Sequence, residues 1–181
     1  MRILLLTAIL VLAGCSSQPA QMSTYLLRPQ ATAFGEELVP EGNFALDGVL
    51  VASYLNQPGL VLATGDGKIH VASHHQWAEP LEISLRQYLS AEISASAGKQ
   101  VEPRARPGID TRINVLVNQL HGDGKGGAVI EAFWELVSKD SDRSYRFYRT
   151  QALSGDGYDA LVQAEEALLR QLAAAIGASL G

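Results

Sequence analysis

The single cysteine of the chain is the residue whose type and position point most directly to chemistry. Cys15 lies in the stretch LVLAGCSS, at the end of an almost unbroken apolar run. One cysteine cannot close an intramolecular disulfide, and it cannot form a cysteine-rich zinc site. Cys15 is therefore a buried apolar residue, a nucleophile, or a site of covalent modification.

The residues before Cys15 favour modification. Met1 and Arg2 form a short positive start, and residues 3–12 are apolar apart from Thr7. This pattern, followed by two small residues, is the layout of a secretory signal peptide. The apolar run is too short for a transmembrane helix, which needs about 20 residues. We therefore predict that residues 1–14 are a signal peptide.

The last residues of this segment, Leu12-Ala13-Gly14-Cys15, resemble the lipobox of bacterial lipoproteins. The resemblance implies cleavage before Cys15, which then carries a diacylglycerol on its sulfur and an acyl group on its amine. Several acyl chains give stable anchoring, whereas one does not. Ser16 in the next position resembles the default signal for transfer to the outer membrane of a Gram-negative cell. Residues 15–24 are the expected lipidated tether, and the folded domain faces the periplasm.

Histidine and serine residues are the candidates for metal binding or hydrolysis. His70 and His74 are four residues apart, but the pattern places them on a strand and the loop after it, so they do not form the helical zinc motif H-E-x-x-H. His75 and His121 complete the set of four histidines. No G-x-S-x-G motif occurs, and Ser154 lies where a strand passes into a helix, which is typical of turns and caps. We expect no enzyme, no metal and no cofactor.

Two loops and one strand resemble other binding motifs without meeting their requirements. Residues 122–127 (GDGKGG) lack the phosphate-loop spacing and precede a strand, so they are predicted to be a hairpin tip. Residues 140–142 (DSD) lack the remaining ligands of a calcium loop. Residues 143–150 (RSYRFYRT) contain three arginines, but strand geometry places Arg146 on the opposite face from the other two. An amphipathic strand is favoured there, with contact to anionic lipid headgroups as the alternative.

Composition sets the class of protein. The chain has 181 residues, of which 47% are hydrophobic and 18% charged, with a formal net charge of −5. These values are ordinary for a globular protein, and the length suits one domain, predicted over residues 25–181. The negative charge argues against nucleic acid as a partner, because that affinity depends on Lys and Arg.

The first half of this domain is predicted to contain short strands followed by a helix. Residues 25–28 and 46–55 have strand patterns, and residues 60–62 and 68–72 flank an Asp-Gly pair typical of a two-residue hairpin. A helix of about 18 residues is then expected to open at Pro80, which suits the first turn, and to end at Gly98. Its apolar stripe consists of Leu81, Leu85, Tyr88, Leu89 and Ile93. Residues 99–109 are expected to form a loop or an irregular edge.

The second half repeats this order. Strands are expected at 110–121, 128–138 and 144–152, with Trp134 on the core face, and a closing helix at 158–178. The core-facing stripe of that helix consists of Leu161, Leu168, Leu172 and Ile176. The sequence therefore predicts an α/β (α+β) fold with two layers, a mixed and largely antiparallel sheet covered by two long helices.

These segments together resemble one lipoprotein family. They are the lipobox, the strand YLL, the segment LVLATGDGKIHVASHHQWAEPLEISLRQYLSAEI, the strand DTRINVLVNQL and the helix ALVQAEEALLRQLAAAI. They resemble the PqiC/YmbA family of ABC-type transport auxiliary lipoproteins over nearly the whole mature chain. The resemblance implies a non-enzymatic, outer-membrane-anchored periplasmic subunit whose partner is a mammalian-cell-entry (MCE) domain protein that moves lipids between membranes.

The most specific motif of this resemblance is Trp77-Ala78-Glu79-Pro80-Leu81. The Trp77 ring can pack against the sheet, and Glu79 can accept hydrogen bonds from the free N–H groups of the first helical turn. The alternative is that Trp77, Glu79 and Pro80 bind a partner or line a pocket. A basic residue often precedes the tryptophan in the family, whereas this chain has Gln76.

Three functions from different classes remain. An auxiliary subunit of an MCE-type lipid transport system, contributing to membrane integrity, predicts an exposed apolar surface or strand edge that a partner covers. A lipid- or small-hydrophobe-binding carrier predicts an apolar cavity of several hundred cubic ångströms between sheet and helices. A hydrolase requires a polar cleft containing Ser154 or a histidine pair. The first is favoured through the resemblance, and self-association is compatible with each.

Overall fold

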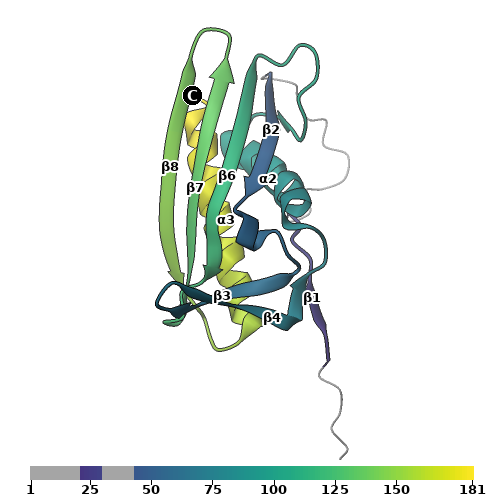
Figure 1. The fold of residues 1–181 in the computed structure, drawn as a ribbon. Coiled ribbons are helices and arrows are strands. Elements are labelled where there is room, and N and C mark those ends of the chain that lie inside the picture. Colours follow the sequence, from purple (N-terminus) through teal and green to yellow (C-terminus); the bar gives the residue numbers. More distant parts are fainter. Residues whose placement is uncertain (1–20, 30–42) are drawn as a thin grey trace, which may run out of the picture.

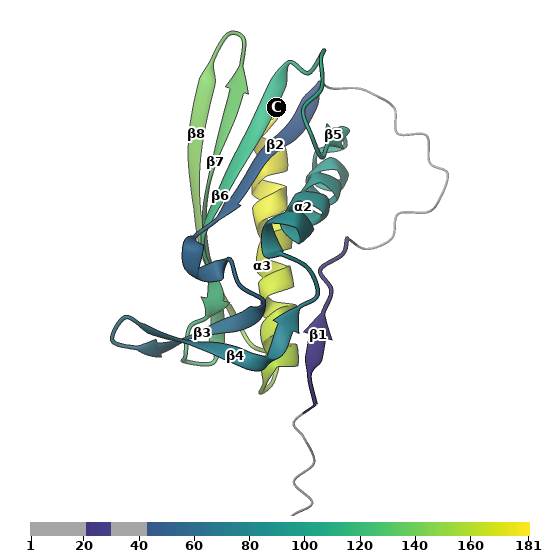
Figure 2. The ribbon, with the colours of Figure 1, turned by 45° about the vertical axis from the view of Figure 1, so that its right-hand side comes forward.

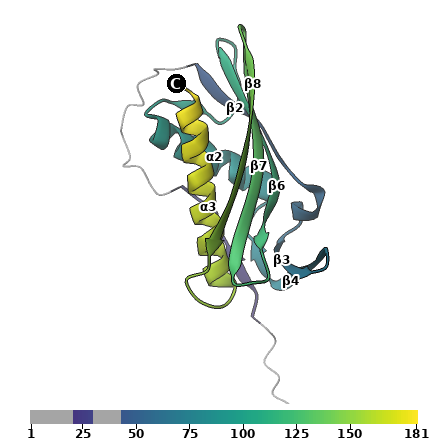
Figure 3. The same cartoon turned by 90° about the vertical axis from the view of Figure 1, so that its left-hand side faces the viewer.

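The structure is a computed structural model that describes residues 21–29 and 43–181. In these residues eight strands form one mixed sheet, and two long helices pack on the same face of it (Figures 1 and 3). Neither α-helix of the described ranges lies on the other face of the sheet (Figure 3). This arrangement confirms the predicted two-layer α/β fold.

The elements lie close to their predicted ranges. The strands are β1 (Ser23–Tyr25), β2 (Phe44–Val51), β3 (Gly59–Gly65), β4 (Lys68–Trp77), β5 (Val101–Glu102), β6 (Thr111–Gly122), β7 (Gly127–Ser138) and β8 (Asp142–Ala152). The helices are the 3-10 turn η2 (Ser53–Leu55) and the α-helices α2 (Leu81–Ala97) and α3 (Tyr158–Ser179). No helix in the described ranges is both long and apolar enough to cross a membrane.

Strand β6 is the centre of the sheet. β7 runs antiparallel along one of its edges, and β8 continues the sheet antiparallel beyond β7. Along the other edge β2 pairs in parallel as far as Val51 and Val117, and β3 meets the same edge again at Leu62 and Gly122. Two strands therefore share one edge of β6, and the β3–β4 hairpin turns away from β2 (Figure 2).

The β3–β4 hairpin has the turn that Asp66-Gly67 predicts. Both residues have positive φ, 51° for Asp66 and 72° for Gly67. These values are those of the tight turns that match the twist of two antiparallel strands. The local sequence thus defines this hairpin without help from the rest of the fold.

Strand β1 (Ser23–Tyr25) shares only Tyr25 with the predicted strand 25–28, and two further predicted strands differ from the observed ones. Residues 53–55 were expected to continue a strand but form η2, because β2 separates from β6 there and Leu55 turns into the core, where it is 3% exposed. Strand β4 extends to Trp77 instead of ending near residue 72, because His75, Gln76 and Trp77 pair with β1. Both differences depend on distant partners, which local patterns do not contain.

The two helices bury the predicted stripes. Leu81, Leu85, Tyr88, Leu89 and Ile93 of α2 are each at most 4% exposed. Gly98 ends α2 in the left-handed conformation, as predicted, whereas Pro80 is the residue just before the helix and not in its first turn. The predicted stripe of α3 is also buried. Several other residues of the helix are buried too, and the charged residue type among them is Glu165, which is only 1% exposed.

The predicted lipidation site lies outside the described residues. Cys15 and the signal peptide fall within residues 1–20, and β1 begins at Ser23, near the end of the predicted tether. In the ribbon, β1 and the start of α3 lie at one end of the domain, and the β7–β8 turn and the C-terminus lie at the other (Figure 1). A membrane anchor at Cys15 would therefore hold the end that contains β1.

Candidate functional site

The Trp77 side chain belongs to the core. Trp77 is the last residue of β4, and its side chain is 7% exposed within the main apolar cluster. The backbone N–H of Trp77 donates to the carbonyl of Pro58 at 2.8 Å, and Trp77 pairs with Tyr25 of β1. Trp77 therefore packs where β1, β4 and the start of α2 meet.

Glu79 binds an arginine and not the helix backbone. Its carboxylate accepts two hydrogen bonds from Arg28, at 2.6 and 3.0 Å, and one from the Ser84 hydroxyl at 3.2 Å. The Arg28 hydrogen bonds lower the pKa of Glu79. No side chain caps the first turn of α2, so the predicted role of Glu79 as an acceptor for its N–H groups is wrong. A two-point contact with a guanidinium is the stronger alternative for a carboxylate.

Pro80 places the backbone for the start of α2. Its carbonyl accepts hydrogen bonds from the N–H groups of Ile83 and Ser84, at 2.9 and 3.2 Å. The motif also lines an open pocket of about 220 Å³ together with residues 56–58. The three motif residues thus lie together, and they join β4, α2 and the segment after β1.

A cluster of aromatic and polar side chains beside this motif could not be found from the sequence. The Tyr25 hydroxyl donates to Asp159 at 2.8 Å and lies 2.8 Å from Nδ1 of His75. The His75 ring in turn stacks on Tyr158, with ring centres 4.1 Å apart. Burial and the carboxylate of Asp159 raise the pKa of Tyr25 to about 12. The cluster fastens β1 to β4 and to the start of α3.

The histidines and Ser154 do not come together. His70, His74 and His75 all lie on β4, so the prediction that His74 falls in a loop is wrong, and His121 lies on β6. The described ranges contain no group of three potential metal ligands. Ser154 is exposed between β8 and α3, where its hydroxyl donates to Gln163 at 3.2 Å.

The loop and strand motifs have the predicted local structures. Residues 122–127 form the β6–β7 hairpin tip, where Asp123 accepts hydrogen bonds from the N–H groups of Lys125 and Gly127. Residues 139–141 form the β7–β8 turn. On β8, Arg146 points to the opposite face from its arginine neighbours and binds Glu131 at 2.6 Å.

An exposed apolar row crosses the uncovered face of the sheet. Leu50, Leu116 and Phe133 lie opposite one another on β2, β6 and β7, and Tyr148 lies on the same face of β8. Their exposed fractions are 60%, 40%, 36% and 50% in that order. We call these four residues the outer apolar row. Contiguous exposed apolar side chains are typical of surfaces that bind a partner.

A polar network borders the outer apolar row. Glu131 is 7% exposed, and its carboxylate accepts hydrogen bonds from Asn118, Gln119 and Arg146 at 2.6–3.1 Å. The hydrogen bonds from Asn118 and Arg146 lower the pKa of Glu131. The Arg146 guanidinium also lies over the Phe133 ring, 5.9 Å from its centre. This network connects Phe133 and Arg146 on the open face, where the Arg146 side chain is 63% exposed.

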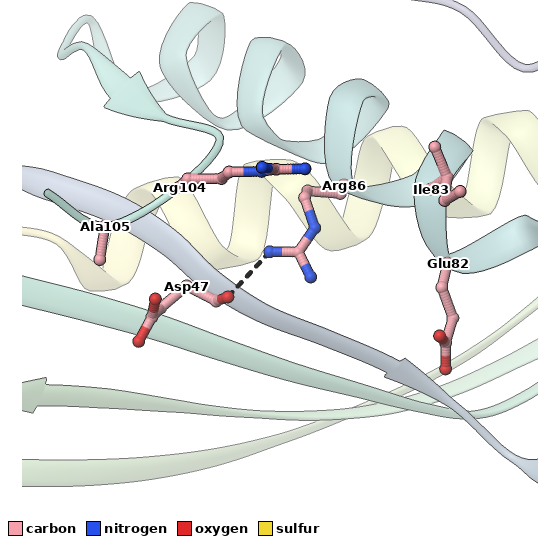
Figure 4. A pocket seen from close by; sticks show the side chains of 6 residues that line it. All are labelled: Asp47, Glu82, Ile83, Arg86, Arg104 and Ala105. Carbon is pink, nitrogen blue, oxygen red and sulfur yellow. Dashed lines mark hydrogen bonds between the residues drawn. The ribbon is translucent and has the colours of Figure 1, made fainter.

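The polar pocket between α2 and β2 has a structural explanation. It has a volume of about 410 Å³ and is lined by charged side chains of both signs, with Arg104 beside Arg86 (Figure 4). Arg86 donates to the carbonyl of Asp47 at 2.8 Å, and Glu82 accepts from the N–H of Val51 at 3.2 Å. Side chains of α2 thereby satisfy backbone groups on the outer edge of β2.

These features define an open two-layer α/β domain, in which one sheet face packs on helices and the other presents an apolar row. Residues 25–177 match the family model of the ABC-type transport auxiliary lipoprotein component. The intermembrane transport lipoprotein PqiC of Escherichia coli is 31% identical over 173 residues, which cover 93% of this chain and 91% of PqiC. The chain therefore belongs to the ABC-type transport auxiliary lipoprotein family.

Solved structures share this fold. The crystal structure of an uncharacterized protein is 27% identical, covers 89% of this chain and 99% of its own, and superposes with a TM-score of 0.77. A protein of Xanthomonas campestris, 20% identical, covers 85% of this chain and 92% of its own with a TM-score of 0.67. The second likeness concerns the fold alone.

Proposed function

We propose that the protein is an outer-membrane lipoprotein, anchored through Cys15, that serves as a non-enzymatic auxiliary subunit of an MCE-type intermembrane lipid transport system. It binds the MCE-domain protein through the outer apolar row. Family membership supports the auxiliary role in transport. The observation that carries the binding surface is the line of exposed apolar side chains on the sheet face that neither α-helix of the described ranges covers.

The geometry of this face suits a protein partner. Neighbouring strands are about 4.8 Å apart, so the row is continuous across β2, β6 and β7. On β8, Arg146 lies opposite Phe133, and Tyr148 lies two residues further along, opposite Glu131. The β6 and β7 members of the row lie on long strands that are paired on both sides, and Arg146 lies over the Phe133 ring. A rigid apolar strip with a polar border is typical of the centre and rim of a protein interface.

A charge in the middle of the row should remove partner binding. We expect Leu116→Asp to lower the amount of MCE-domain protein recovered with the full chain after mild crosslinking of membranes by at least tenfold, because the new carboxylate would have to be desolvated in the interface. Affinity purification followed by mass spectrometry measures this recovery. Gln87→Asp, at an exposed position of α2 in the helix layer, is the matched control and should leave recovery unchanged.

Two results would contradict this function. If wild-type protein recovers no MCE-domain protein or other transporter component, the partner is wrong. If Leu116→Asp and Gln87→Asp recover equal amounts while both fold, the partner binds elsewhere on the domain.

Substitution of Cys15 tests the proposed lipid anchor. We expect Cys15→Ala to abolish incorporation of radioactive palmitate and to leave an unprocessed precursor that no longer fractionates with the outer membrane. Wild-type protein, carried through the same density gradient, provides the comparison. An unmodified Cys15→Ala chain that still floats with outer membrane would contradict lipidation, and so would a free thiol at Cys15 in the mass of the native protein.

The carrier function has one observation in its favour. An apolar pocket of about 320 Å³ lies where the sheet meets the start of α3. Its size is at the lower limit for ligand sites, and it is open to one side, so it is better suited to part of a lipid than to a whole one.

A further inference from the structure

The apolar pocket is built from residues with small or apolar side chains. Five glycines from the β6–β7 turn and the loop before α3 form much of its wall, together with Leu62, Leu153, Leu161 and Tyr158. None of these lining residues is charged. A cavity of this chemistry does not hold ordered water well, and it takes up apolar ligands.

Gly122 keeps the pocket open. A side chain at this strand position would meet Leu62 at 3.3 Å and Leu161 at 3.4 Å. The lining glycines at 124, 126 and 157 have positive φ, which explains their residue type, but Gly122 has no such backbone requirement. A glycine inside a strand weakens the strand unless something approaches closely. Here Leu62 and Leu161 approach Gly122 closely, and because both leucines line the pocket, a side chain at position 122 would push into the pocket wall.

The pocket lies at the end of the domain that an anchor would hold near the bilayer. Tyr158, which lines it, stacks on His75, and His75 contacts Tyr25 of β1. Ser23, where β1 begins, is eight residues after Cys15. A chain of that length spans at most about 28 Å when fully extended. A lipidated Cys15 therefore keeps the pocket within reach of the membrane surface.

Lys125 adds a positive charge at the rim. It is exposed between Gly124 and Gly126, which both line the pocket. Among the described residues no carboxylate forms an ion pair with it at 4.0 Å or less. The same hairpin tip carries Asp123, whose carboxylate accepts hydrogen bonds from the backbone N–H groups of Lys125 and Gly127. The Lys125 ammonium group remains available at the edge of an apolar interior, which matches a ligand that has a hydrocarbon chain and an anionic headgroup.

We propose that this pocket binds the end of one acyl chain of a membrane phospholipid, with the phosphate toward Lys125. The proposal rests on the proposed function, which places the domain at a membrane. Burial of each methylene in the pocket contributes to affinity through the hydrophobic effect. The protein then holds a lipid by one chain while the outer apolar row, on the exposed sheet face, remains available to the partner.

The test uses the full chain in vesicles of phosphatidylethanolamine and phosphatidylglycerol. The vesicles contain a small fraction of phosphatidylethanolamine with a diazirine at the end of one acyl chain. After irradiation and digestion, we expect labels in residues 122–127 and 153–161. Gly122→Val should reduce labelling of these residues at least fivefold, because its side chain fills the pocket.

Gly155→Val is the matched control. Gly155 has an ordinary φ, nothing lies within 4 Å of a side chain placed there, and the residue does not line the pocket. Its labelling should equal that of the wild type. If Gly122→Val does not fold, Leu153→Gln replaces it as the test variant. This substitution makes the pocket wall polar at a half-buried position and should reduce labelling by the same factor.

The proposal is overturned if the labels in the folded domain avoid both these segments and Leu62, which also lines the pocket, or if the Gly122→Val and Gly155→Val chains are labelled equally. It is also overturned if folded wild-type chain remains unlabelled, as it would be if its own Cys15-linked acyl chain filled the pocket. Flotation of the vesicles reports anchoring separately. If the chain does not float with the vesicles, it is irradiated in solution with the corresponding diazirine lysophosphatidylethanolamine. Loss of membrane anchoring and loss of acyl-chain binding in the pocket therefore give different results.

Discussion

Trp77→Ala lowers the free energy of unfolding by about 3–5 kcal/mol, the range found when a buried aromatic side chain is truncated in a core. The Trp77 side chain is 7% exposed, and it packs where β1, β4 and the start of α2 meet. Its loss leaves a cavity beneath all three. Urea unfolding followed by circular dichroism measures the change, with a fall in the midpoint concentration and little change in slope.

Trp77→Phe is the control for this prediction. It keeps an aromatic ring in the core and should recover more than half of the lost stability. If Trp77→Ala unfolds at the wild-type urea concentration but loses the MCE-domain protein in the crosslinking assay, the side chain acts in binding and the packing role is wrong.

Glu165→Gln should stabilise the protein, and increasingly so as the pH rises. Burial raises the pKa of Glu165 from 4.5 to about 8. A carboxyl group whose pKa is raised on folding contributes its full stability below pH 4.5, and this contribution is lost as the pH rises toward 8. At pH 7 the native state retains a proton that the unfolded chain releases, which costs about 3 kcal/mol. Glutamine has no such proton to lose.

Urea unfolding at pH 4.5 and pH 8 measures this effect. The difference between Glu165→Gln and wild type should be small at pH 4.5 and on the order of 3 kcal/mol or more at pH 8. Glu135→Gln makes the same substitution at an exposed position on β7 and is the matched control. Equal stability of Glu165→Gln and wild type at pH 8 would contradict the raised pKa.

Elements set by neighbouring residues could be predicted from the sequence. The Asp66-Gly67 turn, the stripe of α2 and its end at Gly98 all depend on positions a few residues apart. Strand β4 was predicted too short because its last residues pair with β1, some fifty positions earlier in the chain. The order of strands around β6 depends on the same kind of distant pairing.

The chemistry of the site was less accessible to prediction. Cys15 has a local signature, and its modification stays a prediction from that signature. Glu79 was predicted to cap α2, because nothing in the sequence indicates that Arg28 lies beside it. Glu131 and Glu165 are charged residue types in buried positions, and burial follows from packing of the complete sheet and helix layers. The outer apolar row likewise becomes visible only when the register of four strands is known.

The attachment of β1 also has a mechanical consequence for an anchored protein. β1 runs parallel to β4, and the Arg28–Glu79 ion pair lies beyond the end of β1 that faces away from Cys15. A pull on the N-terminus is directed along the strand, so it loads the β1 hydrogen bonds together in shear and does not open them one after another. In an anchored protein, force from a moving membrane is therefore shared between β1 and the Arg28–Glu79 ion pair.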